Sequence, residues 1–166
     1  MNPEIDLTAK QYKFLRSVNH HLIFQLYLFL KLPAAWFAGL KVVSLTNANA
    51  IVSVKHRWFN QNPFQSIYFA VLAMAAELST GLLCMMYVKD DQIKVSMLVV
   101  GVKASFMKKA VGINRFICDE GIKIQEAIEE AKRSKEVVSL EIRSTGYSAQ
   151  NEEIAIFDFL WSFKVK

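Results

Sequence analysis

The chain has 166 residues, of which 53% are hydrophobic and 21% charged, and this length suits one domain, spanning residues 1–166, that can bury a core. A net charge of +5 permits an anionic partner without choosing among nucleic acid, an acidic membrane and a phosphorylated ligand. Cys84 and Cys118 form no Cys-x-x-Cys pair, so we expect core thiols and no disulfide or zinc site. The first residues lack the features of a signal peptide, which predicts a cytoplasmic protein.

The first predicted element is a helix that begins after Thr8, because Thr8-Ala9-Lys10-Gln11 has the form of a capping box. Apolar residues at helical spacing extend the pattern until Pro33 ends it. One long helix and two short helices broken near Asn19 both fit. Residues 1–32 are therefore expected to be an N-terminal helical extension, followed by a turn over 33–39. Adjacent histidines on a helix point in different directions, so His20-His21 is not expected to bind a metal.

Strands are predicted where apolar residues alternate or β-branched residues gather. Two strands form a hairpin before the longest apolar run of the chain, and four more follow that run, with a helix over 121–134 among them. We expect the strand over 93–106 to be a long central strand bent at Gly101, and the last strand to bury a row of aromatic residues. The six predicted strands cover residues 40–45, 50–57, 93–106, 113–119, 137–144 and 153–165.

The longest apolar run follows Asn62-Pro63 and reaches Val88, with one acid, Glu77, near its middle. The run is long enough to span a bilayer, but a central carboxylate penalises insertion, so we favour a buried helix of a globular core. An ionised carboxylate among apolar residues must be paired, hydrogen-bonded or protonated. Glu77 is therefore either a catalytic acid or a buried acid with a local partner.

The residues that share a helix face with Glu77 are nearly all small, whereas the opposite face is bulkier and suits packing onto a sheet. A stripe of small residues would let a second subunit's helix or a slender ligand approach the backbone, and Thr80 and Gly81 are the candidate ligand contacts. The members of this stripe are Ala70, Ala73, Met74, Thr80, Gly81 and Cys84.

The order of elements predicts an α+β fold. Consecutive strands joined by short turns imply an antiparallel sheet, and the apolar face of such a sheet needs the long helix laid over it. We therefore expect a curled antiparallel sheet wrapped around one long central helix, with its core in residues 40–165.

This arrangement resembles the hotdog-fold thioesterase superfamily. In the acyl-CoA thioesterase branch of that superfamily, an Asn opens a loop, His-Gly-Gly opens the long helix, and an acid follows the Asn by fifteen residues. Asn62 and Glu77 keep that spacing, but Gln65 replaces a Gly of the loop and Tyr68-Phe69-Ala70 replaces His-Gly-Gly. The stretch from 105 to 112 also resembles a family motif, with Lys109 in place of a Pro. The similarity covers 32–164 and is closest to an uncharacterised branch.

The resemblance implies that Glu77 acts as a general base toward water or as a nucleophile at a thioester carbonyl. Asn62 would help to place the water or the carbonyl, and a plain helix-entry turn is the alternative role for this residue. Backbone N–H groups near Tyr68 and Phe69 would bind the developing oxyanion, with help from the helix dipole.

The resemblance also suggests where coenzyme A would bind, as part of the substrate and with no other cofactor. Lys108, Lys109 and Arg115 are candidate contacts for its phosphates, and a solvated turn is the alternative for the lysines. Because the acid in this family usually acts across a subunit interface, a homodimer is implied, with a tetramer also open.

Three functions follow from these features. The first is a homodimeric thioesterase that hydrolyses a medium- or long-chain acyl-CoA thioester. The second is a non-catalytic hotdog module that binds acyl-CoA or a fatty acyl group, which the loss of His-Gly-Gly favours. The third is a membrane-associated protein, which the apolar stretches and the basic charge favour. We expect no nucleic acid partner, no bound metal and no insertion across a membrane.

Overall fold

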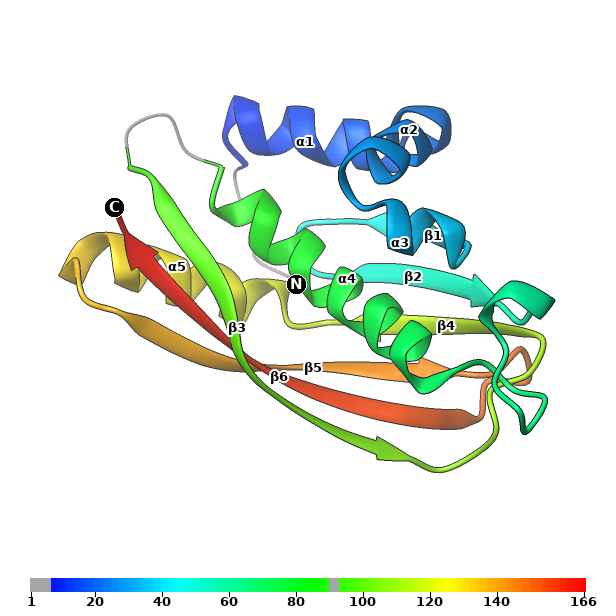
Figure 1. Cartoon of the computed structure of the whole chain (residues 1–166). Coiled ribbons are helices and arrows are strands. Elements are labelled where there is room, and N and C mark those ends of the chain that lie inside the picture. Colours follow the sequence, from blue (N-terminus) through cyan, green and yellow to red (C-terminus); the bar gives the residue numbers. More distant parts are fainter. Residues whose placement is uncertain (1–6, 90–92) are drawn as a thin grey trace.

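The computed structural model describes residues 7–89 and 93–166, which form one sheet and the helices packed on it (Figure 1). Three helices precede the first strand, and a short 3-10 helix (η1) precedes the long helix α4. The elements are α1 (Ala9–Asn19), α2 (His21–Lys31), α3 (Pro33–Phe37), β1 (Leu40–Leu45), β2 (Ala50–Lys55), η1 (Trp58–Asn60), α4 (Phe69–Tyr87), β3 (Val95–Phe106), β4 (Ile113–Cys118), α5 (Gly121–Ser134), β5 (Val138–Tyr147) and β6 (Glu153–Val165).

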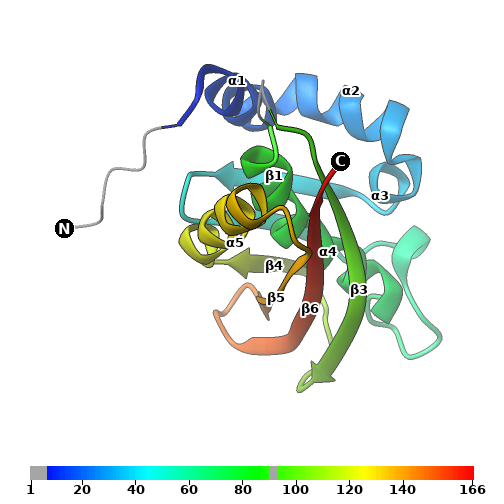
Figure 2. The same cartoon turned by 90° about the vertical axis from the view of Figure 1, so that its left-hand side faces the viewer.

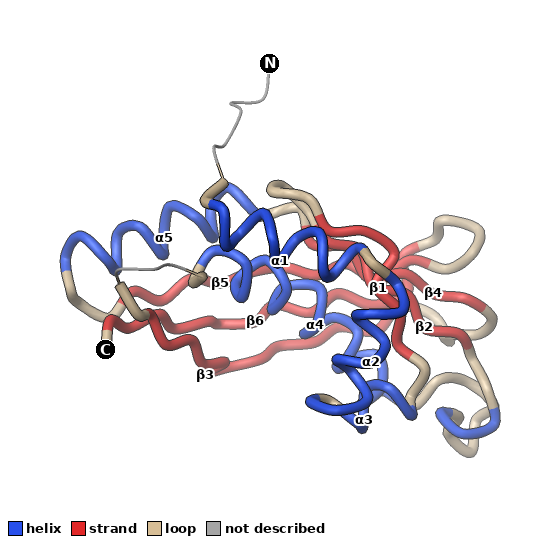
Figure 3. Tube along the Cα trace, turned by 90° about the horizontal axis from the view of Figure 1, so that it is seen from above, coloured by secondary structure: helices blue, strands red, loops and turns tan. Residues whose placement is uncertain are grey.

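The six strands form one antiparallel sheet in the order β1-β2-β4-β5-β6-β3. The sheet curls around α4, as two perpendicular views show (Figures 1 and 2). This confirms the predicted α+β fold with a curled sheet around one central helix. Seen from above, the other helices lie around α4, with α2 and α3 at one end and α5 at the other (Figure 3).

The prediction that the strand over 93–106 is central is wrong, because β3 is an edge strand that pairs only with β6 among the described strands. β3 and β6 are the two longest strands of the sheet and are similar in length. Their pairing joins distant parts of the chain, so the order of the strands along the sequence does not reveal it. The predicted bend is confirmed, since the register of β3 shifts between Val99 and Gly101. One side of β3 is therefore left open along the sheet edge.

The sequence fitted either one long N-terminal helix or two short ones, and the structure has two short helices, α1 and α2. The capping box is confirmed, because the Gln11 N–H donates to Thr8 Oγ1 at 3.3 Å and the Thr8 N–H donates to Gln11 Oε1 at 3.0 Å. The chain breaks at His20, which has extended backbone angles. The Asn19 side chain exchanges two hydrogen bonds of 2.8 Å with the backbone of Leu45, and this contact ties the break to β1. The predicted turn over 33–39 contains the short helix α3.

The core lies between α4 and the concave face of the sheet. The predicted aromatic row of β6 is confirmed: Phe157, Phe159, Trp161 and Phe163 are all buried. α4 is long and apolar enough to cross a membrane by length and composition, but 67% of its most apolar window is buried inside the fold. The core helix of a globular protein has the same composition, and here the sheet supplies the apolar environment.

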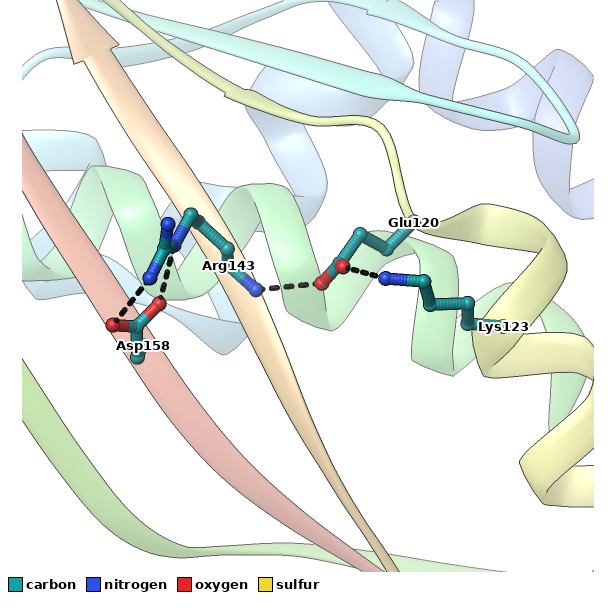
Figure 4. A network of polar contacts seen from close by, with 4 residues as sticks. All are labelled: Glu120, Lys123, Arg143 and Asp158. Carbon is teal, nitrogen blue, oxygen red and sulfur yellow. Dashed lines mark hydrogen bonds and ion pairs between the residues drawn. The ribbon is translucent and has the colours of Figure 1, made fainter.

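A network of charged groups ties the start of α5 to strands β5 and β6 (Figure 4). Arg143 on β5 binds Asp158 on β6 through two hydrogen bonds of 2.7 and 3.1 Å, and its backbone N–H donates to Glu120 at 2.7 Å. Glu120 also accepts from Lys123 at 2.6 Å. The hydrogen bonds that Arg143 donates to the Asp158 carboxylate raise the pKa of Arg143. These charges neutralise one another, so the network serves to position α5.

Candidate functional site

Glu77 lies on the strip of α4 that faces away from the sheet. Its neighbours on this strip, Ala70, Ala73 and Met74, are half-buried, whereas most of the remaining helix surface is buried. The Glu77 side chain itself is accessible to solvent in the single chain. Nearby apolar groups still desolvate its carboxyl group and raise the pKa above the ordinary value of 4.5. A carboxylate with a raised pKa in an accessible position is suited to accept a proton.

A groove beside Glu77 was not predicted from the sequence. Its volume is about 320 Å³, and the corner between α2 and α3 forms one wall while α4 forms the other. The signal that could have revealed it is Pro33 followed by two alanines, because proline favours the first turn of a helix and alanine leaves space beside it. The lining residues are Lys31, Leu32, Pro33, Ala34, Ala35, Met74, Glu77 and Leu78.

A larger cavity, of about 690 Å³, lies where α1, the end of α4 and the start of β3 meet. It is lined mainly by lysines and by the apolar residues Phe14, Val88 and Val95. None of the predicted site residues lines it. The groove beside Glu77 is smaller but holds the carboxylate, so we take it as the candidate site.

Asn62 forms the turn that leads into α4. Its Oδ1 accepts hydrogen bonds from the backbone N–H of Phe64 at 3.0 Å and of Ser66 at 3.2 Å, and from Ser66 Oγ at 3.2 Å. Its Nδ2 donates to the carbonyl of Ile67 at 3.4 Å. Gln65 in this turn has a positive φ of 60°, a conformation that glycine adopts more readily than other residues. These bonds are the ones expected of a helix-entry turn, and the catalytic role of Asn62 stays a prediction.

Of the two backbone donors predicted at the start of α4, one is already used. The Tyr68 N–H donates to the Asn60 carbonyl at 2.9 Å, so it is already used within the chain. The Phe69 N–H, at the first position of the helix, has no acceptor in the part of the chain that the structure describes. Both side chains are exposed, and their rings contact each other at a centroid distance of 5.0 Å. An oxyanion at this helix start would therefore meet the Phe69 N–H beside two aromatic rings.

Thr80 and Gly81 are buried inside the chain itself. The Trp161 Nε1–H donates to Thr80 Oγ1 at 3.1 Å, and a Cβ added to Gly81 would lie 3.6 Å from the Trp161 ring. Thr80 Oγ1 in turn donates to the Glu77 carbonyl at 3.0 Å. Trp161 thus fills the space that the sequence interpretation left to a partner helix or a ligand, and these two residues position the helical turn that carries Glu77.

The predicted phosphate contacts already have partners within the chain. Lys108 pairs with Glu152 at 2.6 Å, and the Lys109 Nζ lies 3.5 Å from the Phe64 carbonyl. Arg115 donates to Asn151, which neighbours Glu152 in the loop between β5 and β6. Lys108 and Lys109 lie close to the Asn62 turn, because the Ile67 N–H bonds to the carbonyl of Ala110, the residue after Lys109, at 2.9 Å.

Glu77 and the start of α4 do not come together within one chain. Glu77 lies eight residues after Phe69, and a rise of about 1.5 Å per residue separates them by about 12 Å along the helix axis. One small reacting group cannot contact both. The predicted residues therefore form two half-sites of a single chain, one at the helix start and one at Glu77.

The cysteines and histidines form no second site. In residues 7–89 and 93–166 no three His, Cys, Asp or Glu side chains gather in a way that could hold a metal ion. Cys84 and Cys118 are buried free thiols, and burial raises the pKa of Cys118 to about 12 and that of Cys84 well above its ordinary value. Both thiols are therefore protonated core groups, as predicted.

A curled antiparallel sheet around one central helix, with an acid on the exposed strip of that helix, is the hotdog fold that the sequence predicted. Residues 20–151 match the family described as a domain of unknown function, DUF4442, and the chain belongs to this family. A search of the curated proteins finds no match.

Several solved structures share the fold at low sequence identity. A Pseudomonas aeruginosa protein of unknown function, whose name adds "probable thioesterase", is 19% identical with a TM-score of 0.73, over 86% of this chain and 95% of that one. The Escherichia coli PaaI protein, from the phenylacetic acid degradation operon, is 12% identical with a TM-score of 0.63, over 92% and 94%. A Haemophilus influenzae thioesterase is 10% identical with a TM-score of 0.59, over 84% and 88%.

Proposed function

We propose that this protein hydrolyses an acyl-CoA thioester, with Glu77 as the general base that activates water or as the nucleophile. The observation that carries the proposal is the accessible carboxyl group of Glu77, with its raised pKa, at the edge of an apolar groove. A base whose pKa is closer to the working pH transfers protons more effectively. Solved hotdog structures that bear the name thioesterase support the same reaction class.

In this proposal the apolar groove receives the start of the acyl chain. Leu32, Ala35 and Leu78 line the groove together with Glu77, so the carbonyl would lie near the acid while methylene groups contact aliphatic side chains. The groove is at the small end of the range for ligand pockets. A medium-length chain fits this size, and a longer one would extend past the α2–α3 corner.

The oxyanion would be bound by the Phe69 N–H of a second copy of the chain. The separation of the two half-sites supports a homodimer, because antiparallel α4 helices would place the start of one beside the middle of the other. The open edge of β3 supports a homodimer further. Val102 and Phe106 pair with the buried residues Phe159 and Ala155 of β6, so their side chains lie on the side of β3 that faces α4. They are nevertheless 60% and 51% exposed. A second copy would cover both the edge and these side chains.

Asn62 is proposed as a positioning residue, because its hydrogen bonds set the turn before Phe69. Lys108 and Lys109 lie near this same helix start, and together with Arg115 they would bind the phosphates of coenzyme A in exchange for their present partners. Exposed ion pairs such as that of Lys108 are weak and exchange readily. A cytoplasmic location is part of the proposal, since coenzyme A thioesters are its substrates.

The test is Glu77→Gln, which keeps the size of the side chain and removes its basicity. Hydrolysis of acyl-CoA thioesters over a series of chain lengths is measured together with binding of the same molecules. We expect a loss in rate of about a hundredfold or more with binding retained. Glu126→Gln, on the exposed face of α5, is the matched control and should hydrolyse like the wild type. Equal rates for Glu77→Gln and the wild type would refute the role of Glu77.

The non-catalytic alternative is favoured by one observation: Tyr68-Phe69-Ala70 stands where related proteins have His-Gly-Gly, so Phe69 and Ala70 replace the two glycines. If the wild-type protein binds acyl-CoA but hydrolyses none of the series, the binding module is the correct function. Light scattering tests the homodimer: we expect twice the mass of the 18.9 kDa chain. Val102→Lys should yield the monomer, because it places a charge on the proposed interface.

A further inference from the structure

An aromatic and aliphatic surface extends over α2, α3 and η1. Leu26, Phe29 and Leu30 share one face of α2 and are 59%, 46% and 64% exposed. From Phe29 the rings run in contact through Trp36 and Phe37 to Phe59, with centroid distances of 5.0, 5.1 and 6.1 Å. Trp58 beside them is 82% exposed. We call these residues the α2–η1 face, and Figures 1 and 2 show its elements on one side of the molecule.

This face belongs to a part of the chain without acidic residues. From residue 7 to residue 76 there is no Asp and no Glu, while seven lysines and arginines occur in that stretch. Lys31 follows the exposed face of α2 directly, and Arg57 directly precedes η1. α1, β1 and α4, against which α2 and α3 pack, carry one carboxylate, Glu77. The surroundings of the α2–η1 face are therefore basic.

We propose that the α2–η1 face docks on the surface of an anionic phospholipid bilayer, without spanning it. Exposed Leu, Phe and Trp side chains on a helical segment flanked by Lys and Arg are the chemistry of interfacial binding. Aromatic rings favour the headgroup boundary, and cations at that depth are attracted by acidic lipids. A protein partner would need a pocket for a side chain as exposed as Trp58, whereas a fluid bilayer needs no matching shape.

A second copy of the chain fits this face less well than a bilayer does. A two-fold interface would place the same patch on both sides, so Lys31 and Arg57 of one copy would face those of the other. No acid from residues 7–76 could neutralise them, and like charges close together repel. The dimer proposed above uses β3 and α4, which leaves the α2–η1 face free for lipid.

The face also leads into the groove beside Glu77. Lys31 and Leu32 line that groove, and Leu32, directly after α2, is 40% exposed. Docking through α2 and α3 would hold the mouth of the groove close to the membrane. An acyl chain that partitions into the bilayer would then reach the groove over a short apolar path.

The test is sedimentation of the full chain with vesicles of phosphatidylcholine alone and of phosphatidylcholine with phosphatidylglycerol. We expect binding to the anionic vesicles that weakens as salt is added. The double variant Leu26→Glu, Leu30→Glu should bind about tenfold more weakly. Val137→Glu, an exposed apolar residue after α5 at the other end of the molecule, is the control and should bind like the wild type. Circular dichroism verifies that all three proteins are folded.

Fluorescence gives a second measurement, because Trp36 and Trp58 lie on the face while Trp161 is buried. Lipids brominated in the acyl chain should quench the wild type, and Trp58→Phe should lose most of that quenching. Equal sedimentation of the wild type and the double variant would overturn the proposal, as would absence of binding to anionic vesicles. If the double variant instead changes the mass seen in light scattering and vesicles bind neither protein, the face is an interface between copies.

Discussion

The contact between Trp161 and Thr80 links the sheet to the turn of α4 that carries Glu77, and its removal gives a measurable prediction. Trp161 is 4% exposed and Thr80 is fully buried, and they share a hydrogen bond of 3.1 Å. Trp161→Phe removes this bond, at a cost of about 0.5–1.5 kcal/mol. It also removes part of a buried ring, whose complete loss costs about 3–5 kcal/mol, so we assign about 1–2 kcal/mol to the partial loss. The free energy of unfolding should therefore fall by about 1.5–3.5 kcal/mol.

The companion variant is Thr80→Val, which keeps the shape of the side chain. It leaves the buried indole N–H without an acceptor, at a cost of about 1–3 kcal/mol. Both single variants remove the same hydrogen bond. The loss of unfolding free energy in the double variant should therefore be about 1 kcal/mol smaller than the sum of the losses in the two single variants.

Urea unfolding followed by circular dichroism, at one fixed protein concentration, measures all four proteins. The thermal midpoints should fall in parallel, with Trp161→Phe about 3–14 °C below the wild type for a chain of this length. Strict additivity of the two single variants, within about 0.3 kcal/mol, would refute the coupling and with it the role of Trp161 in positioning this turn.

Three other predictions use the same structure. Because burial raises the pKa of Glu77, the folded protein binds more protons than the unfolded one and loses stability as pH rises from about 4.5 through the raised value. Glu77→Gln should therefore unfold at a higher temperature than the wild type at about pH 8 and at the same temperature at about pH 4; a lower midpoint at the higher pH would contradict this. Cys84 and Cys118, buried with raised pKa values, should resist iodoacetamide in the folded state and react after unfolding, as mass spectrometry would show. Gly121→Ala places a Cβ 2.3 Å from the Asn47 carbonyl oxygen and should cost about 2–4 kcal/mol in urea unfolding, whereas the control Gly101→Ala meets only an ordinary contact at 3.6 Å; equal losses in both would contradict the argument.

Residues within a few positions of one another determined the elements that the sequence predicts well. The capping box at Thr8, the bounds of α5 and the aromatic alternation of β6 all follow from local spacing, and the structure confirms them. Glu77 could also be identified from sequence, because a lone acid in an apolar helix is a local anomaly. The break between α1 and α2 could be placed only approximately, since Asn19 finds its partner at Leu45 in β1.

The tertiary structure alone decided which groups meet across the fold. β3 lies at the sheet edge because it pairs with β6, a contact between strands separated by two others and a helix in the chain. Trp161 covers Thr80 and Gly81, and α3 forms the groove wall beside Glu77. Spacing along the sequence shows which residues share a helix face, but the side chain that fills the space beside that face comes from a distant strand. For that reason the sequence by itself determined the helix and its acid, and the packing of the sheet and of α3 decided which side of the helix stays open for chemistry.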